Sequence, residues 1–182
     1  MLRPAHSPHH PMHVTLRGRR DLPSLRRHVF GAVRDAIAKA SKEAFRVIHF
    51  SVQRDHVHLI VEGADRKRVI RGIQGLVIRL ALAVNRAAGR RGSVWDDRYH
   101  GRELRTPREV RNAIAYVLLN WKKHVREARS TVDRCSSGAW FDGWRNVEPA
   151  AMAACPVVAA HTWLVRVGWR RYGLLRLDEA PA

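Results

Sequence analysis

Three short stretches in the first half of the chain have the hydrophobic pattern of β-strands. Residues 12–17 alternate between polar and apolar positions, and Gly18 ends the run. Residues 45–53 are rich in Val, Ile and Phe, and residues 56–62 form a second apolar run after the short connection Arg54-Asp55. The pattern therefore predicts one strand over residues 12–17 and a hairpin of two strands over residues 45–53 and 56–62.

Two longer stretches carry apolar residues every three or four positions, the spacing of a helix with one buried face. Residues 22–43 and residues 66–88 both show this pattern, and Gly89 ends the second one. A third helix is predicted from Thr106-Pro107-Arg108-Glu109, where Thr is an N-cap residue, Pro fits the first helical position and Glu completes a capping box.

A fourth strand is expected over residues 101–105, after the segment 94–100 that follows the second helix. The order of elements is then strand, helix, strand, strand, helix, strand, which is the βαββαβ order of ferredoxin-like folds. Such a fold belongs to the α+β class and has an antiparallel sheet with two helices on one face. The helix that begins at Thr106 follows the fourth strand closely, so we expect it to lie across the sheet as an additional element.

The composition adds a strong positive charge to this picture. Lys and Arg together number 34 against 16 Asp and Glu, which gives a formal charge of +18 and a pI of about 11.5. Such an excess creates a field that attracts polyanions, and nucleic acid is the leading partner. A general preference for Arg in the genome would explain part of the arginine content but not the shortage of acidic residues.

The hydrophobic pattern and the charge together predict the domain organisation. Residues 1–11 are rich in Pro and His and are expected to be a flexible leader. Residues 12–124 form the main domain. Residues 125–182 have a weaker pattern and are interpreted as a basic C-terminal extension that binds DNA or packs on the domain.

The cellular location is predicted from the cysteines and from the distribution of apolar residues. Cys135 and Cys155 form no CxxC motif, which favours free thiols in the cytosol over a disulfide scaffold. Residues 1–11 lack the apolar run of a signal peptide, and no segment approaches the ~20 apolar residues of a membrane span. We expect a cytoplasmic protein that associates with the nucleoid and not with a membrane.

The candidate chemistry begins with two histidines in the third predicted strand, His56-Val57-His58. Successive side chains of a strand point to opposite faces, so His56 and His58 share one face and Val57 takes the other. Two imidazoles on one face can share a metal ion, although a polar sheet face without a metal would have the same pattern.

Tyr116 is the candidate nucleophile. On the predicted helix it lies off the apolar face, in a polar stripe made of Glu109, Asn112, Tyr116, Asn120 and Lys123. Asn120, one turn further on, offers an amide oxygen as a third ligand for Mg²⁺ or Mn²⁺. Such an ion would polarise a scissile phosphate while the phenolate of Tyr116 attacks phosphorus, which gives a covalent phosphotyrosine. A second DNA 3′-hydroxyl can then reverse the step on a new strand, which is strand transfer.

These motifs together resemble the HUH single-tyrosine transposases, and most closely the REP-associated tyrosine transposases. The resemblance extends over residues 13–124 and rests on His56-Val57-His58, on Tyr116 with Asn120 four residues later, and on the segment 95–104 before the tyrosine helix. It implies a ferredoxin-like core and a metal-dependent endonuclease and strand transferase that acts on single-stranded DNA folded into hairpins, such as REP-like repeats. It also implies Tyr116 as nucleophile and Mg²⁺ or Mn²⁺ held by His56, His58 and Asn120. We expect a monomer or a homodimer.

Two positions depart from the pattern of that family. Asp55 precedes the first histidine where relatives often have Asn, and Trp121 follows Asn120 where many have Pro. Neither position supplies the chemistry. Trp121 puts in doubt only how the tyrosine helix continues.

Contacts with DNA are expected from basic and aromatic side chains. Arginine and lysine would follow the phosphate backbone and make binding sensitive to salt. The predicted DNA-binding residues are Arg66, Arg68, Arg71, Arg98, Tyr99, Arg102, Arg105, Arg108 and Lys123. Unpaired bases could stack on aromatic rings, although at least half of the six tryptophans are expected to be packing residues. The candidates for stacking are Trp95, Tyr99, Trp121, Trp163 and Trp169.

Two other functions stay open. A domesticated transposase of the same fold could bind DNA hairpins without cutting them. A two-histidine RNA phosphoesterase, which uses neither metal nor tyrosine, would need His-x-Thr/Ser motifs such as His13-Val14-Thr15 and His49-Phe50-Ser51. Taken singly, His13, His49 and His100 are more often structural or surface histidines than site residues.

Overall fold

The computed structural model describes residues 7, 9–124, 131–145, 147 and 154–179; residues 1–6 and 8 of the predicted leader and 125–130 of the predicted extension lie outside this part. Within it, no helix is both long and apolar enough to cross a membrane. The elements in chain order are β1 (Met12–Arg17), α1 (Leu25–His28), α2 (Phe30–Ala38), β2 (Phe45–Val52), β3 (His56–Gly63), α3 (Arg66–Ala87), β4 (His100–Glu103), α4 (Pro107–Leu119), the 3₁₀ turns η1 (Asn120–His124) and η2 (Ser137–Trp140), α5 (Trp163–Arg166) and the 3₁₀ turn η3 (Gly168–Tyr172).

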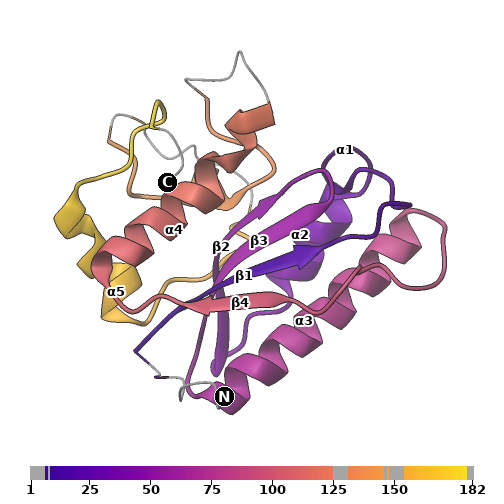
Figure 1. Ribbon diagram of the computed structural model, residues 1–182, viewed down its shortest axis with the longest axis horizontal. Coiled ribbons are helices and arrows are strands. Elements are labelled where there is room, and N and C mark those ends of the chain that lie inside the picture. Colours follow the sequence, from indigo (N-terminus) through magenta and orange to yellow (C-terminus); the bar gives the residue numbers. More distant parts are fainter. Residues whose placement is uncertain (1–6, 8, 125–130, 146, 148–153, 180–182) are drawn as a thin grey trace.

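The four strands form one antiparallel sheet in the order β2-β3-β1-β4 (Figure 1). This is the ferredoxin-like order, and it confirms the predicted α+β fold. The predicted hairpin of β2 and β3 is closed by a hydrogen bond of 2.8 Å from the amide of Gln53 to the carbonyl oxygen of His56. Because β3 and β1 are the central strands, His56 and His58 stand away from the sheet edges.

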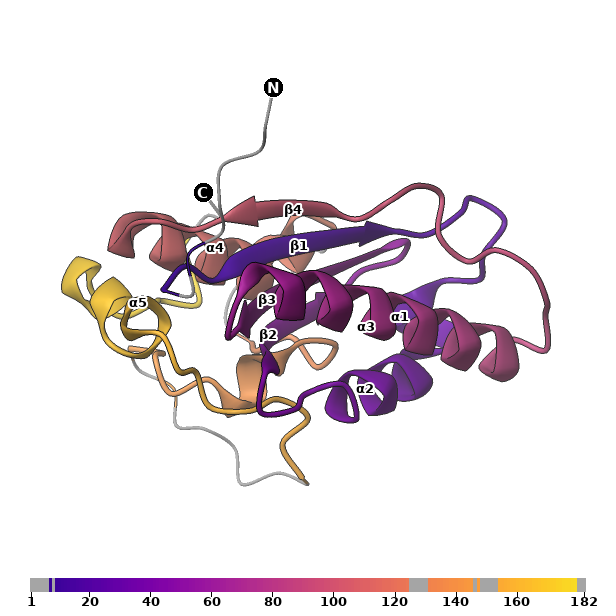
Figure 2. The same ribbon diagram turned by 90° about the horizontal axis from the view of Figure 1, so that it is seen from below.

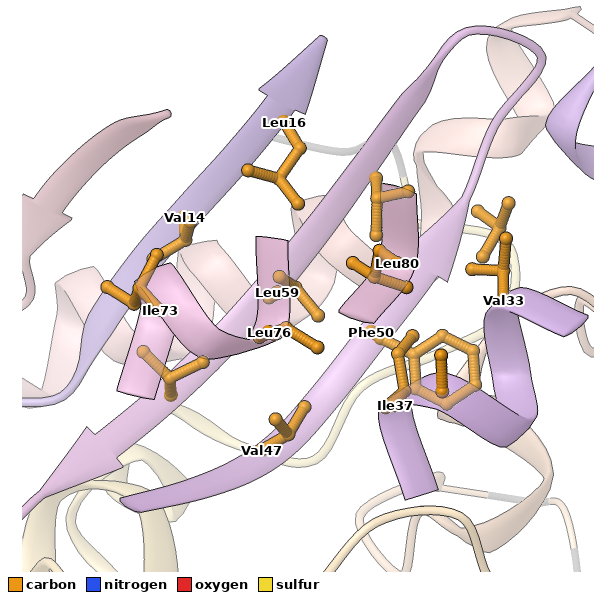
Figure 3. Packing of buried hydrophobic residues seen from close by; sticks show 14 of the residues in the cluster. Val14, Leu16, Val33, Ile37, Val47, Phe50, Leu59, Ile73, Leu76 and Leu80 are labelled. Carbon is orange, nitrogen blue, oxygen red and sulfur yellow. The ribbon is translucent and has the colours of Figure 1, made fainter. Parts of the chain in front are cut away.

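One face of the sheet is covered by α2 and α3 (Figure 2). Val14 of β1, Phe50 of β2 and Leu59 of β3 are completely buried there against Ile73 and Leu80 of α3 (Figure 3). Burial of each such side chain stabilises the fold by roughly 1.5–3 kcal/mol. This layer fixes the strands relative to one another, so the side chains that alternate to the opposite face are held at fixed positions.

The opposite face of the sheet is covered by α4, as the sequence predicted (Figure 2). The predicted capping box is present at its start: the amide of Glu109 donates to Thr106 Oγ1 (3.2 Å), and the amide of Thr106 donates to the Glu109 carboxylate (3.1 Å). Ile48 and Ile60 of the sheet pack against Ile114 of α4 in a second core. The helix that carries Tyr116 is thereby held across the middle of the sheet.

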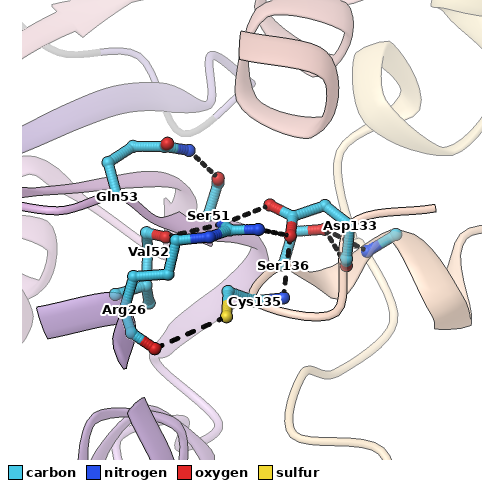
Figure 4. Close-up of polar contacts among 8 residues, drawn as sticks. Arg26, Ser51, Val52, Gln53, Asp133, Cys135 and Ser136 are labelled. Atoms are coloured by element: carbon cyan, nitrogen blue, oxygen red, sulfur yellow. Dashed lines mark hydrogen bonds and ion pairs between the residues drawn. The ribbon is translucent and has the colours of Figure 1, made fainter. Parts of the chain in front are cut away.

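Two buried carboxylates tie the described C-terminal residues, 131–145 and 154–179, to this domain. Asp133 forms a bidentate ion pair with Arg26 of α1 (Figure 4), in which Arg26 Nη1 lies 2.9 Å from Asp133 Oδ2. Glu62 of β3 accepts hydrogen bonds from the amide of His161 (2.6 Å) and from the amide and hydroxyl of Thr162 (3.1 and 2.6 Å). The described part of the predicted C-terminal extension therefore packs on the sheet and on α4.

The first predicted helix is not continuous. Val29, with φ of −130°, separates α1 from α2, and α2 ends at Ala38, before its predicted end. The break falls within residues 28–31, which have low helix propensity, while Val29 stays buried and leaves the apolar spacing intact. A reciprocal pair of backbone hydrogen bonds between Lys42 and Phe45 (2.7 and 3.1 Å) turns the chain into β2. Hydrophobic spacing alone shows neither feature.

The fourth strand lies close to its predicted place in residues 101–105, since β4 spans His100–Glu103. Only His100–Glu103 pairs with β1 over consecutive residues, and Trp95 makes one isolated bridge with Gly18. Trp95 donates from Nε1 to the carbonyl oxygen of Val77 in α3 (3.0 Å). Because its ring is anchored on this helix, the chain leaves the sheet edge between Trp95 and the start of β4.

Candidate active site

His56 and His58 lie on the face of the sheet that α4 covers. Their neighbours Val57 and Leu59 are completely buried on the other face, as strand alternation predicted. The two rings are parallel within 6°, with centroids 6.0 Å apart. His58 is buried, whereas His56 is partly open to solvent.

Each histidine is oriented by a neighbour at its Nδ1 atom. His56 Nδ1 donates to the carboxylate of Asp55 at 2.7 Å. His58 Nδ1 lies 3.1 Å from Thr15 Oγ1, and Thr15 is the residue opposite His58 in β1. The Nε2 atoms are therefore the ring atoms left for a ligand, and hydrogen bonds of this kind typically orient histidines that bind metals.

Tyr116 of α4 reaches this pair of histidines. Its ring is half-buried and lies edge-on to His58, with centroids 5.2 Å apart and an angle of 86°. Asn120 follows at the end of α4. Its backbone N–H donates to the carbonyl oxygen of Tyr116, and only 7% of the residue is exposed. The structure thus brings Tyr116 and His58 together; the role of Asn120 as a ligand stays a prediction.

His13 of β1 is a further member of the site, in contrast to its interpretation from the sequence as more often structural. Its ring centroid lies 5.7 Å from that of His58 and 5.6 Å from that of Tyr116. Its Nε2 atom is buried and has no hydrogen-bond partner among the residues that the structure describes. The signal was present in the sequence, because alternation in a central strand places His13 and Thr15 on the face opposite Val14; what was missing was the register against β3.

Burial keeps the inner imidazoles neutral. It lowers the pKa of His58 to about 3, with smaller contributions from the charges of His13 and His56. It lowers the pKa of His13 to about 4, to which the positive charge of Arg102 also contributes. A neutral imidazole is the form that binds a metal ion, so these rings can accept one at neutral pH without releasing a proton.

The donor atoms of the site fit a divalent ion that is only partly coordinated by protein. Among the described residues, no three His, Cys, Asp or Glu side chains are close enough to hold a metal ion by themselves. Two imidazoles with free Nε2 atoms and an amide oxygen would leave other coordination positions for water or phosphate, which suits Mg²⁺ or Mn²⁺.

Several predicted DNA contacts line one groove of about 530 Å³ between the starts of α3 and α4 and the edge strand β4. Arg66, Tyr99, Arg102 and Arg105 all contribute to its wall. Arg71 lines a second hollow of about 420 Å³ together with Arg66. Three other predicted contacts lie apart from these hollows: Arg68 beside the N-cap residue Asp65, Arg98 before β4, and Arg108 on α4. The prediction for Lys123 falls on a side chain outside the described part of the chain.

The tryptophans divide between core and surface. Trp121 and Trp169 are 7% and 1% exposed, so the prediction that they could stack with bases was wrong. Trp169 was misplaced because the second core, formed with the C-terminal residues, could not be seen in the sequence pattern. Trp121 lies under the guanidinium of Arg26, 5.5 Å from its ring centroid, a contact between residues far apart in the chain. Trp95 is half-buried against α3, and Trp163 is 48% exposed.

Comparison with known proteins supports the fold. No family model matches the sequence, and no curated protein matches it. Among solved structures, a REP-associated tyrosine transposase bound to a REP hairpin superposes with a TM-score of 0.56 at 18% sequence identity, over 69% of this chain and 74% of that chain. The fold is transposase-like. At this identity the likeness shows the architecture, and the chemistry has to be argued from the residues of this chain.

Proposed function

We propose that this protein is a metal-dependent endonuclease and strand transferase for single-stranded DNA that folds into hairpins such as REP-like repeats. The observation that carries the proposal is the edge-on contact of Tyr116 with His58, a histidine whose Nδ1 is already occupied by Thr15. The transposase-like fold supports it, and so does the resemblance of the histidine and tyrosine motifs to the HUH single-tyrosine transposases.

The residues of the site would divide the chemistry between them. His56, His58 and Asn120 would hold Mg²⁺ or Mn²⁺, which supplies Lewis-acid polarisation of the scissile phosphate. The phenolate oxygen of Tyr116 forms a bond to phosphorus as the bond from phosphorus to the DNA 3′-oxygen breaks. The phenol proton leaves Tyr116, and the departing 3′-oxygen takes up a proton. A second 3′-hydroxyl can reverse these bond changes, which joins it to the strand held on Tyr116.

The substrate class is inferred from the charge and from the groove beside β4. Arg66, Arg102 and Arg105 bring three guanidinium groups to this groove, and Tyr99 brings an aromatic ring. Guanidinium groups suit phosphates, and an aromatic ring suits an unpaired base. The similar solved transposase is bound to a REP hairpin, which supports a hairpin substrate for this chain.

The decisive experiment mixes the protein with single-stranded DNA from the repeats that flank its gene, in Mg²⁺ or in EDTA. We expect a denaturant-resistant protein–DNA adduct in Mg²⁺ that EDTA prevents. Tyr116→Phe and His58→Ala should abolish it, whereas His28→Ala, which removes an exposed histidine of α1, should not. An adduct that survives Tyr116→Phe would overturn the proposal.

The same experiment separates the two alternatives. A hairpin-binding protein that does not cut would bind the DNA without forming an adduct and would bind equally well as Tyr116→Phe. A two-histidine phosphoesterase is not favoured by the geometry, because Ile60 stands between His13 and His49 in the strand register and the ring of His49 faces Phe141 in the core. It would hydrolyse a 2′,3′-cyclic phosphate in EDTA.

A further inference from the structure

The C-terminal turns α5 and η3 present an aromatic and basic surface beside α4. Trp163 and Tyr172 are 48% and 51% exposed. A guanidinium lies over each ring: that of Arg171 is 4.8 Å from the centroid of Trp163, and that of Arg108 on α4 is 5.9 Å from the centroid of Tyr172. These four residues are called the α5–η3 platform below. Large rings that stay exposed with cations stacked on them are typical of a binding surface more than of a core.

The platform is held in place by contacts with the second core and with α4. Trp169, between the two exposed rings in sequence, is buried in the second core. A Cβ atom at Gly168 would lie 2.7 Å from the ring of Trp163, so the glycine is what lets this ring lie close to the backbone of η3. Arg111 of α4 donates to the carbonyl oxygen of Gly173 (2.9 Å) and fixes the end of η3 on the helix. The exposed rings therefore belong to a fixed scaffold.

The positive charge of the platform is not neutralised by the described residues. Within them, no carboxylate lies at ion-pair distance from Arg108, Arg166 or Arg171, all of which are exposed. The neighbouring Arg170, in contrast, is paired with Asp142 at 2.7 Å. Unpaired guanidinium groups beside flat aromatic rings complement a polyanion that also carries flat rings.

We propose that the α5–η3 platform binds an unpaired stretch of single-stranded DNA. The guanidinium groups of Arg171 and Arg108 turn from the rings of Trp163 and Tyr172 to the phosphates, and bases stack on the ring faces that they leave. Stacking accepts any base, and guanidinium groups follow the backbone irrespective of sequence. The inference rests on the proposed function for its substrate and extends it. Arg108 precedes Tyr116 by eight residues on α4, about 12 Å along the helix axis at 1.5 Å per residue. The platform would therefore hold DNA within a few nucleotides of the nucleophile.

A protein partner fits this surface less well. Val167 and Leu174 are also exposed beside the platform, at 50% and 37%, and could contribute to an apolar interface. However, the buried centre of a protein interface is depleted in charged residues, and three unpaired arginines would have to lose their hydration there. Single-stranded DNA neutralises these charges and uses the rings together.

The test measures the affinity of a fluorescent oligodeoxythymidine by anisotropy, in a Tyr116→Phe background that cannot form an adduct. Trp163→Ala and Tyr172→Ala should each raise Kd roughly five- to hundredfold, the loss expected for one base–aromatic stack. Trp163→Phe should retain most of the affinity. Arg171→Gln should weaken binding and lower the salt dependence by about one phosphate contact. Arg86→Gln, which removes the same charge from the exposed face of α3, is the matched control.

The outcomes separate this inference from the proposed function. Unchanged affinity in a folded Trp163→Ala and Tyr172→Ala double variant overturns the platform, and so does a Trp163→Leu variant that binds as tightly as the native chain. A native dimer in sedimentation equilibrium that becomes a monomer in the double variant would identify the surface as a self-association interface instead. Platform-dependent binding without any adduct in the native protein would contradict the proposed function alone.

Discussion

Asp55 and Thr15 are expected to tune the metal site without touching the ion. Asp55 accepts from Nδ1 of His56, and Thr15 contacts Nδ1 of His58, so each holds one imidazole in place. Loss of such an orienting group typically lowers metal affinity 10- to 100-fold. We therefore expect Asp55→Ala and Thr15→Val each to weaken Mn²⁺ binding by about this factor, measured by electron paramagnetic resonance.

The control for this prediction is Asp35→Ala. Asp35 is an exposed carboxylate of α2, on the other side of the sheet, where it contacts only its neighbour Arg34 among the described polar contacts. The Asp35→Ala substitution removes the same charge as Asp55→Ala but should leave the affinity for Mn²⁺ unchanged. Native affinity in both site variants would show that the histidines are not oriented through these contacts.

The individual site residues differ in how far the sequence could predict their places. His56 and His58 share a face because strand alternation is a local property, and the same holds for Tyr116, which helical periodicity places off the apolar face. His13 lies beside them only because β1 pairs with β3 in one particular register. The contacts of His13 with His58 and Tyr116 join residues far apart in the chain, and the local pattern of each segment carries no information on that pairing.

The capping box gives α4 a stability that depends on pH. The pKa of Glu109 is lowered first by the hydrogen bond from the Arg105 amide (2.7 Å) and further by that from Thr106. A lowered pKa means that this contribution is complete above the unfolded value of 4.5 and is lost as pH falls through the folded pKa. We expect Glu109→Ala to reduce the free energy of unfolding by about 1 kcal/mol at pH 7, measured in urea, and by less at pH 3.

Glu43→Ala serves as the comparison for the cap, because Glu43 is exposed and lies in the turn after α2. It should change the free energy of unfolding little at either pH. A Glu109→Ala variant that loses the same stability at pH 3 as at pH 7 would mean that the side chain stabilises α4 by packing and not as an ionised cap.

The helices and strands themselves show which signals in the sequence were sufficient. The start of α4 and the extent of α3 were predicted correctly because helix caps and helical periodicity depend only on residues that are close together in the sequence. The break at Val29 was not predicted. Val29 is itself buried, so the helical spacing of apolar residues continues through the position where the helix is interrupted. The place of β4 was predicted within two residues, whereas the anchoring of Trp95 on α3 is a tertiary contact that the local pattern does not show.

The ion pair between Arg26 and Asp133 is expected to hold the C-terminal residues on the domain. The side chain of Asp133 is fully buried, and that of Arg26 is 25% exposed and lies over Trp121. Removal of one partner leaves the other charge in the interior without compensation, which costs roughly 3–5 kcal/mol. We expect Arg26→Ala to lower the free energy of unfolding by about this amount, whereas Arg34→Ala, which breaks an exposed pair on α2, should cost less than about 1 kcal/mol. Equal effects of the two substitutions in urea unfolding would contradict the structural role of Asp133.

Two buried histidines, His49 and His58, and the half-buried His13 make the stability of the whole molecule depend on pH. Burial is the main cause that lowers the pKa of His13 and His49 to about 4 and that of His58 to about 3, from an ordinary value of 6.5. In the unfolded chain each takes up a proton near pH 6.5, while in the folded protein each stays neutral down to about pH 4 or below. The unfolded state therefore binds more protons in this interval, and stability falls with decreasing pH.

The free energy of unfolding is expected to be at its full value above pH 7 and to fall between about pH 6.5 and 4, by up to about 1.4 kcal/mol per pH unit for each histidine. Urea titrations at half-unit steps of pH measure this slope. His49→Gln removes one buried group and should make the slope shallower, even though its stability at pH 7 is lower. His28→Gln removes an exposed histidine of α1 and should leave the slope as it is. If the pH slope of the unfolding free energy stays unchanged in His49→Gln, the folded protein admits a charged imidazole at position 49. The second core around His49 would then be more hydrated than the contact of His49 with Phe141 indicates.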